Sequence, residues 1–146
     1  MTAVHAALGV ALVVVNLAAG ALGLWCWRRG EQSRAFWPLL RAGQALVVME
    51  ALDGVIVLAQ GRDLPPLHLI YGLTPLGVSF LAEQLRLASA DTVLQSRGLD
   101  DAQAMRGLPD GEQRAIVHAI VQREMAVMAA SALVVVVLGL RAGGWL

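Results

Sequence analysis

The alternation of apolar and polar stretches divides the chain into four long apolar runs separated by polar connections. The runs cover residues 4–27, 36–60, 66–88 and 122–140. Each run is long enough to cross about 30 Å of hydrocarbon as an α-helix that rises about 1.5 Å per residue. The pattern therefore predicts an all-α polytopic membrane protein, with four transmembrane helices in a single bundle domain over residues 1–146.

The lengths of the connections predict how the helices are arranged. Two short connections, residues 28–35 and 61–65, favour an up-down bundle of antiparallel neighbours. The third connection, residues 89–115, is longer and carries helix signals of its own. Gly98 ends an extension of the third helix, Asp100 starts a brief helix that ends near Gly107, and Pro109 with Asp110 starts the fourth helix. We therefore expect a helical cytoplasmic connection between the third and fourth spans.

The composition agrees with a membrane protein and excludes several other classes. Hydrophobic residues make up 58% of the chain, charged residues make up 15%, and the mean hydropathy is +0.65. A soluble chain of 146 residues has too little core volume to hide that much apolar surface. Eleven basic and eleven acidic residues balance, which leaves no basic face for a nucleic acid. The single cysteine, Cys26, excludes an intramolecular disulfide and a CxxC redox or zinc motif.

The placement of arginine predicts the orientation in the membrane. Nine of the eleven Arg residues lie in or beside the connections 28–35 and 89–115, and only Arg62 and Arg141 lie on the other side. By the positive-inside rule, both termini are expected outside the cytoplasm. All basic residues are Arg, and Ala, Val, Leu and Gly are abundant, as is typical of a GC-rich bacterial genome. We therefore expect the bacterial plasma membrane as the location.

Ionisable residues inside the spans predict a site towards the outer face. Such a side chain costs about 2.5–3.5 kcal/mol at the centre of a membrane helix, so it usually faces the bundle interior and marks a function. His5 and His68 begin their helices at the outer face, Asp53 lies about two turns deeper, and Glu50 lies one turn below Asp53. Pro75 frees a backbone carbonyl near Tyr71.

These residues suit two kinds of ligand. Paired imidazoles suit low-spin haem, so His5 and His68, with Tyr71 beside them, are the predicted cofactor-binding residues for haem b. Imidazole together with carboxylate suits a divalent transition metal, for which His5, His68, Glu50 and Asp53 are the predicted ligands.

A second group of polar residues continues towards the inner face. At helical spacing, each of these residues falls on the polar face of its own helix, and a bundle that closes these faces on one axis holds a broken polar column. Arg41 points away from that face and is expected to snorkel to the inner interface. The members of the predicted pathway are Asn16, Ser79, Glu83, Arg86 and Glu124.

We expect a non-enzymatic function, namely binding of haem or a metal ion at the outer site. Two alternatives stay open: an accessory or assembly subunit of a larger membrane complex, and a proton-coupled transporter or cation channel that works as a homodimer. The chain contains no GxSxG, HExxH, CxxC or P-loop motif, so an enzyme is the weaker expectation. The lipid bilayer is the expected partner in every case.

Overall fold

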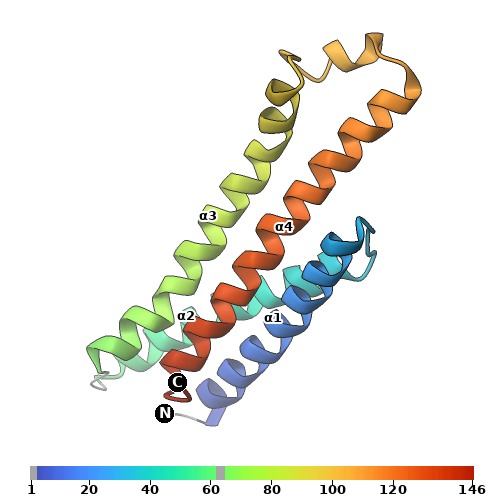
Figure 1. Cartoon of the computed structure of the whole chain (residues 1–146). Coiled ribbons are helices and arrows are strands. Elements are labelled where there is room, and N and C mark those ends of the chain that lie inside the picture. Colours follow the sequence, from blue (N-terminus) through green and yellow to red (C-terminus); the bar gives the residue numbers. More distant parts are fainter. Residues whose placement is uncertain (1–2, 62–64) are drawn as a thin grey trace.

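The computed structural model describes residues 3–61 and 65–146, and every regular element in these ranges is a helix. The helices are α1 (Ala3–Arg29), α2 (Phe36–Ala59), α3 (Pro66–Ser96), the short 3₁₀ helix η1 (Ala104–Gly107) and α4 (Asp110–Ala142). The α-helices run up and down in succession, so the start of α1 and the end of α4 lie at the same end of the molecule (Figure 1). The prediction of an all-α chain is confirmed. Arg62, assigned above to the outer connection, lies outside the described residues.

Within the described ranges, three helices are long and apolar enough to cross a membrane, namely α1, α2 and α4. The third predicted span lies in α3, which is interrupted by polar residues such as His68, Glu83 and Arg86 and is not among them. The membrane character of the chain is thus supported by three of its four long helices. Below, the end of the bundle where α1 begins is called the outer end, and the opposite end is called the inner end.

The bundle is packed unevenly around α4. Helix α4 packs mainly against α1 and α3, α2 packs mainly against α1, and contact between α2 and α3 is sparse. Small residues allow the close approach of α1 and α4, because a Cβ atom added at Gly20 would lie 2.6 Å from Cδ2 of Leu133. The inner half of the core is filled by large buried side chains, including Phe36, Leu40 and Met125.

A buried polar residue joins α1 to α2 in the middle of the bundle. Asn16 is 2% exposed, and its Nδ2 donates to the carbonyl of Leu12 at 2.9 Å and to the carbonyl of Gly43 at 3.4 Å. A Cβ atom added at Gly43 would lie 2.8 Å from Oδ1 of Asn16. The glycine therefore makes room for the amide that links the two helices.

This contact gives a stability prediction. We expect Gly43→Ala to lower the free energy of unfolding by about 1–3 kcal/mol, because the added methyl group overpacks a buried contact. Gly77→Ala is the matched control on α3, since a Cβ atom there meets nothing within 4 Å; it should gain up to about 1 kcal/mol from helix propensity. The two variants can be compared by denaturant titration in mixed micelles. Equal effects would show that the Asn16 contact does not limit the approach of α1 and α2.

The long connection contains the predicted helical pieces, with one correction. Helix α3 continues to Ser96 and is followed by Gly98 in the left-handed conformation with a φ of 70°, and α4 begins directly after Pro109, as predicted. The brief helix does not begin at Asp100. Instead, Oδ1 of Asp101 accepts from the backbone N–H groups of Gln103 and Ala104, both at 2.8 Å. A short Asp side chain readily reaches N–H groups two and three residues further along the chain and so favours a turn before the helix.

Side chains from the inner half of α4 form hydrogen bonds with the turn between α1 and α2. Nε2 of His118 lies 2.9 Å from the carbonyl oxygen of Gly30, and Nε2 of Gln122 donates to the carbonyl of Glu31 at 3.2 Å. Beyond this turn, α3 and α4 continue together as a long hairpin (Figure 1). These contacts join residues far apart in the chain, so the sequence pattern did not indicate them.

Candidate functional site

A cavity of about 430 Å³ lies in the outer half of the bundle. All four α-helices contribute to its wall, and its size lies within the range of about 300–1,000 Å³ that is usual for small-molecule sites. Five wall positions are glycines, and they leave space where side chains would otherwise fill the bundle: Gly9 on α1, Gly54 on α2, Gly72 on α3, Gly139 on α4 and Gly143 directly after α4. The sparse contact between α2 and α3 has the same effect.

His5 is the centre of the polar end of this cavity. Its Nδ1 lies 3.0 Å from Oδ2 of Asp53 and 3.4 Å from Oε1 of Glu50. The two carboxyl groups stand one turn apart on α2, so both reach the same imidazole on α1. The side chains of His5, Glu50 and Asp53 are only 9%, 15% and 23% exposed, respectively, so this cluster is largely shielded from the surroundings.

Glu50 presents an unsatisfied oxygen at this site. Its Oε2 is buried and has no hydrogen-bond partner among the residues that the structure describes. The other oxygen, Oε1, lies close to the backbone of α1, since a Cβ atom added at Gly9 would come within 3.3 Å of it. Burying an acceptor without a donor costs about 1–3 kcal/mol or more. Oε2 of Glu50 therefore needs either a proton of its own or a donor from outside the described residues.

His68 brings α3 to the same site. Its ring centroid lies 5.7 Å from that of His5, and the two ring planes are inclined by 55°. Nδ1 of His68 lies 2.9 Å from the carbonyl oxygen of Ala142, which can only accept, so Nδ1 carries a proton and donates. Tyr71 also lines the cavity, and Cζ of Arg141 lies 5.9 Å from the centroid of its ring.

The four predicted outer residues thus lie together, but they do not surround one point. Among residues 3–61 and 65–146, no group of three or more His, Cys, Asp or Glu side chains has a geometry that could hold a metal ion. The reason is visible in the contacts, because Glu50 and Asp53 both approach Nδ1 of His5 and leave no shared centre between the three side chains. The coordination of a metal by all four residues therefore finds no support in this arrangement.

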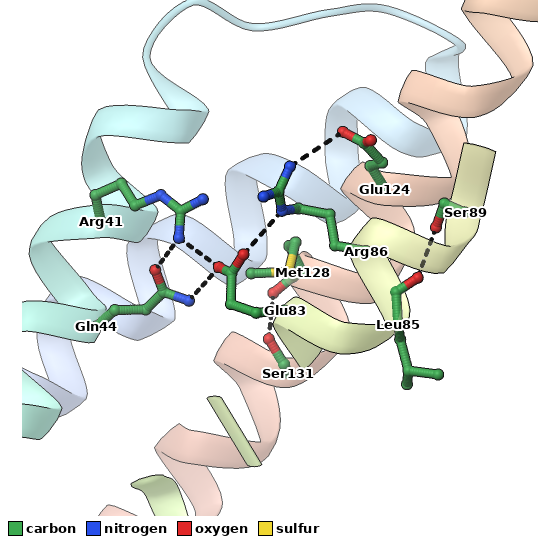
Figure 2. A network of polar contacts seen from close by, with 9 residues as sticks. All are labelled: Arg41, Gln44, Glu83, Leu85, Arg86, Ser89, Glu124, Met128 and Ser131. Atoms are coloured by element: carbon green, nitrogen blue, oxygen red, sulfur yellow. Dashed lines mark hydrogen bonds and ion pairs between the residues drawn. The ribbon is translucent and has the colours of Figure 1, made fainter. Parts of the chain in front are cut away.

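The inner polar residues form a separate network that joins three helices, as Figure 2 shows. Glu83 on α3 accepts hydrogen bonds from Arg41 and from Nε2 of Gln44 on α2, the latter at 2.9 Å. Arg86 donates from Nε to Oε2 of Glu83 at 2.9 Å, and its Nη1 lies 3.8 Å from Oε2 of Glu124 on α4. One carboxylate and one guanidinium on α3 thus bind both neighbouring helices.

The network corrects one expectation. The expectation that Arg41 points away from the polar face is wrong, because its long side chain reaches back to Gln44 at 2.6 Å and to Glu83. Glu83 and Arg86, three residues apart on one helix, also form an ion pair with each other. The sequence reading missed Gln44, although it lies three residues after Arg41 and so on the same side of α2.

An apolar layer separates the outer site from the inner network. Asn16 lies near the middle with its amide bonded to backbone carbonyls, and Ser79 is half-buried on α3 between Pro75 and Glu83. The predicted polar column is therefore divided into an outer cluster and an inner network. The core residues of the separating layer are Leu12, Val13, Val47, Val135 and Val136.

Two parts of the outer site were not anticipated from the sequence. Trp145, which follows α4, lines the cavity, and the carbonyl of Ala142 holds the imidazole of His68. The position of Trp145 depends on the turn that follows α4, and the contact of His68 is made by a backbone group. Neither feature produces a side-chain pattern that the sequence could reveal.

Comparison of the chain with family models, with curated proteins and with solved structures gives no match.

Proposed function

We propose that this chain is a four-span membrane protein that binds a small ligand, without chemical conversion, in its outer cavity. The observation that carries the proposal is the buried Oε2 of Glu50, which has no partner among the described residues and belongs to a side chain that lines the cavity. A ligand with a hydrogen-bond donor would satisfy this oxygen, while the mostly apolar wall would enclose its body. His5 and Asp53 complete the polar end of the site.

The fourth span in this proposal is α3. It packs alongside α4, which is one of the three apolar helices, and it exposes large apolar side chains such as Phe80, Leu81 and Leu87. Its two charged residues in the inner half, Glu83 and Arg86, form an ion pair that reduces the cost of placing either charge in a membrane. With nine arginines at the inner end, both termini would then lie outside the cytoplasm, in a bacterial plasma membrane.

A second candidate is haem b, held between His5 and His68. Each imidazole is engaged at Nδ1, by Asp53 in one case and by the carbonyl of Ala142 in the other. Imidazoles that ligate iron or another metal commonly have this second contact, which fixes the tautomer that presents Nε2. An absorption spectrum of the purified protein distinguishes this candidate, because bound haem gives a Soret band and a ligand without a chromophore does not.

The proposed cavity can be tested by filling it. We expect Gly72→Phe to abolish binding of a naphthalene probe, because Gly72 lines the cavity and a Cβ atom there meets no atom within 4 Å. The ring should therefore occupy the space of the ligand without displacing a helix. Gly77→Phe is the matched control on the same helix, since its Cβ also meets nothing within 4 Å and it does not belong to the cavity wall.

The measurement is equilibrium titration of the full chain in detergent micelles with 2-naphthylmethanol and 2-naphthylmethylamine. Binding that Gly72→Phe removes and Gly77→Phe retains would support the cavity as the site. If neither probe binds, or if both variants bind as the parent chain does, the proposal is wrong. The alternative of an assembly subunit, in which the polar faces serve only helix packing, would then take its place.

A further inference from the structure

The two carboxyl groups of the outer site contact the same basic side chain. Glu50 and Asp53 both approach His5, and one imidazole carries at most one positive charge. With both carboxyl groups ionised, these three side chains therefore hold at least one surplus negative charge. An unpaired charge is costly to keep in an apolar surrounding, so the surplus has to be removed by a proton or balanced by a bound cation.

The other basic groups near the cavity are engaged elsewhere. His68 donates a hydrogen bond from Nδ1 to the carbonyl of Ala142. Arg141 donates from Nη1 to the carbonyl of Leu146 at 2.7 Å and faces the ring of Tyr71. Arg141 lines a second pocket at the outer end, whose wall also includes His68 and Tyr71. The carboxyl pair on α2 is thus balanced by His5 alone among the side chains shown to contact it.

The wall of the cavity favours a particular type of cation. Most of its residues are apolar, which suits an organic body and not a hydrated inorganic ion. Two aromatic side chains, Tyr71 and Trp145, also line it, and aromatic ring faces attract ammonium groups. Oε2 of Glu50 needs a donor, which a protonated amine supplies as an N–H group.

Resting on the proposed function, we infer that the ligand is a lipophilic ammonium ion: an apolar or aromatic body with a protonated amine that donates an N–H to Oε2 of Glu50. The amine balances the surplus charge of the carboxyl pair, and the body occupies the space left by the wall glycines. Both features of the site, its apolar volume and its unsatisfied acceptor, are then used by one molecule.

The position of the cavity is consistent with entry from the lipid. Its wall includes Val55 and Leu58 on α2 and Leu69 and Leu73 on α3, all of which are exposed on the outer surface of the bundle. These residues flank the sparsely packed boundary between α2 and α3. An amphiphilic cation that partitions into the outer leaflet would therefore reach the cavity without crossing the apolar core.

The test compares three probes that share one naphthalene body. The probes are 2-naphthylmethylamine, a cation with N–H donors; its N,N,N-trimethyl derivative, a cation without them; and 2-naphthylmethanol, which is neutral. We expect the amine to bind about tenfold more tightly than the alcohol, because a charge-assisted hydrogen bond replaces a neutral one. The trimethyl derivative should bind more weakly than the amine, since it has no N–H group that can donate a hydrogen bond to Glu50.

The role of the carboxylate is tested by Glu50→Gln, which should reduce the affinity of the amine to that of the alcohol and leave the alcohol unchanged. Glu112→Gln is the matched control, because it makes the same substitution at an exposed position in the first turn of α4. If Glu50→Gln does not fold, Glu50→Asp retains the charge, withdraws the carboxylate by one methylene group and should also weaken binding of the amine.

The outcomes separate this inference from the proposed function. If the alcohol binds as tightly as the amine, or if Glu50→Gln leaves the preference for the amine intact, the ligand is not recognised as a cation and the inference is wrong. The cavity would still be the binding site as long as Gly72→Phe blocks both probes. If none of the three probes binds the parent chain, the inference and the proposed function fail together.

Discussion

Replacing Glu83 by lysine is expected to prevent the bundle from folding. Glu83 accepts from both Arg41 and Arg86, so Glu83→Lys would place three cations against one another. The side chains of Glu83 and Arg86 are each only 24% exposed, so the substitution removes a partly buried ion pair and adds repulsion between like charges. Both effects act against a usual stability of only about 5–15 kcal/mol. The measurement is the yield of monodisperse protein in size-exclusion chromatography after detergent extraction.

Two controls show whether the loss comes from the network. Gln95→Lys places a lysine at an exposed position of α3 beyond the predicted span and should leave the yield unchanged. Glu83→Gln retains a group that can accept hydrogen bonds and should be intermediate. If Glu83→Lys were recovered as well as Gln95→Lys, the network shown in Figure 2 would contribute little to folding.

Labelling of single cysteines should give an all-or-none result for the topology. The protein contains one buried cysteine, Cys26, which would first be replaced by alanine. Cysteine is then introduced at three exposed glutamines, Gln32, Gln60 and Gln103. With four spans and both termini outside, a membrane-impermeant maleimide should label position 60 in intact cells and should reach positions 32 and 103 only after lysis.

The same experiment decides whether α3 crosses the membrane. If only α1, α2 and α4 were to cross, Gln103 would lie on the same side as Gln60 and would be labelled in intact cells. Labelling of position 32 from outside would reverse the proposed orientation. The pattern of three sites therefore gives a different result for each arrangement.

Much of the fold follows from apolar periodicity and from local signals at helix ends. The four apolar runs correspond to the four α-helices, and Gly98 and Pro109 mark real boundaries in the long connection. These features depend on interactions within a few residues, so a single sequence reveals them. The relative packing of the helices depends instead on distant pairs such as Gly20 with Leu133, and for this reason the weak contact between α2 and α3 was not foreseen.

The outer site was predictable in its membership but not in its geometry. The cost of ionisable groups in lipid singled out His5, Glu50 and His68, and the structure brings them together around one cavity. Which atoms face each other could not be derived from helical spacing alone. The approach of both carboxyl groups to Nδ1 of His5 requires the rotation of α1 against α2, which glycines such as Gly9 and Gly54 permit.

The absence of proline within α4 and its presence within α3 give the two long helices different mechanical properties. Helix α4 runs from Asp110 to Ala142 with its backbone hydrogen-bond ladder uninterrupted by proline, and it touches both the inner turn and the outer site. Pro75 has no backbone N–H, so α3 lacks one backbone hydrogen bond directly at the cavity wall. Bending is therefore easiest in α3 at the level of the cavity, so the volume of the cavity can change while α4 remains a stiff support.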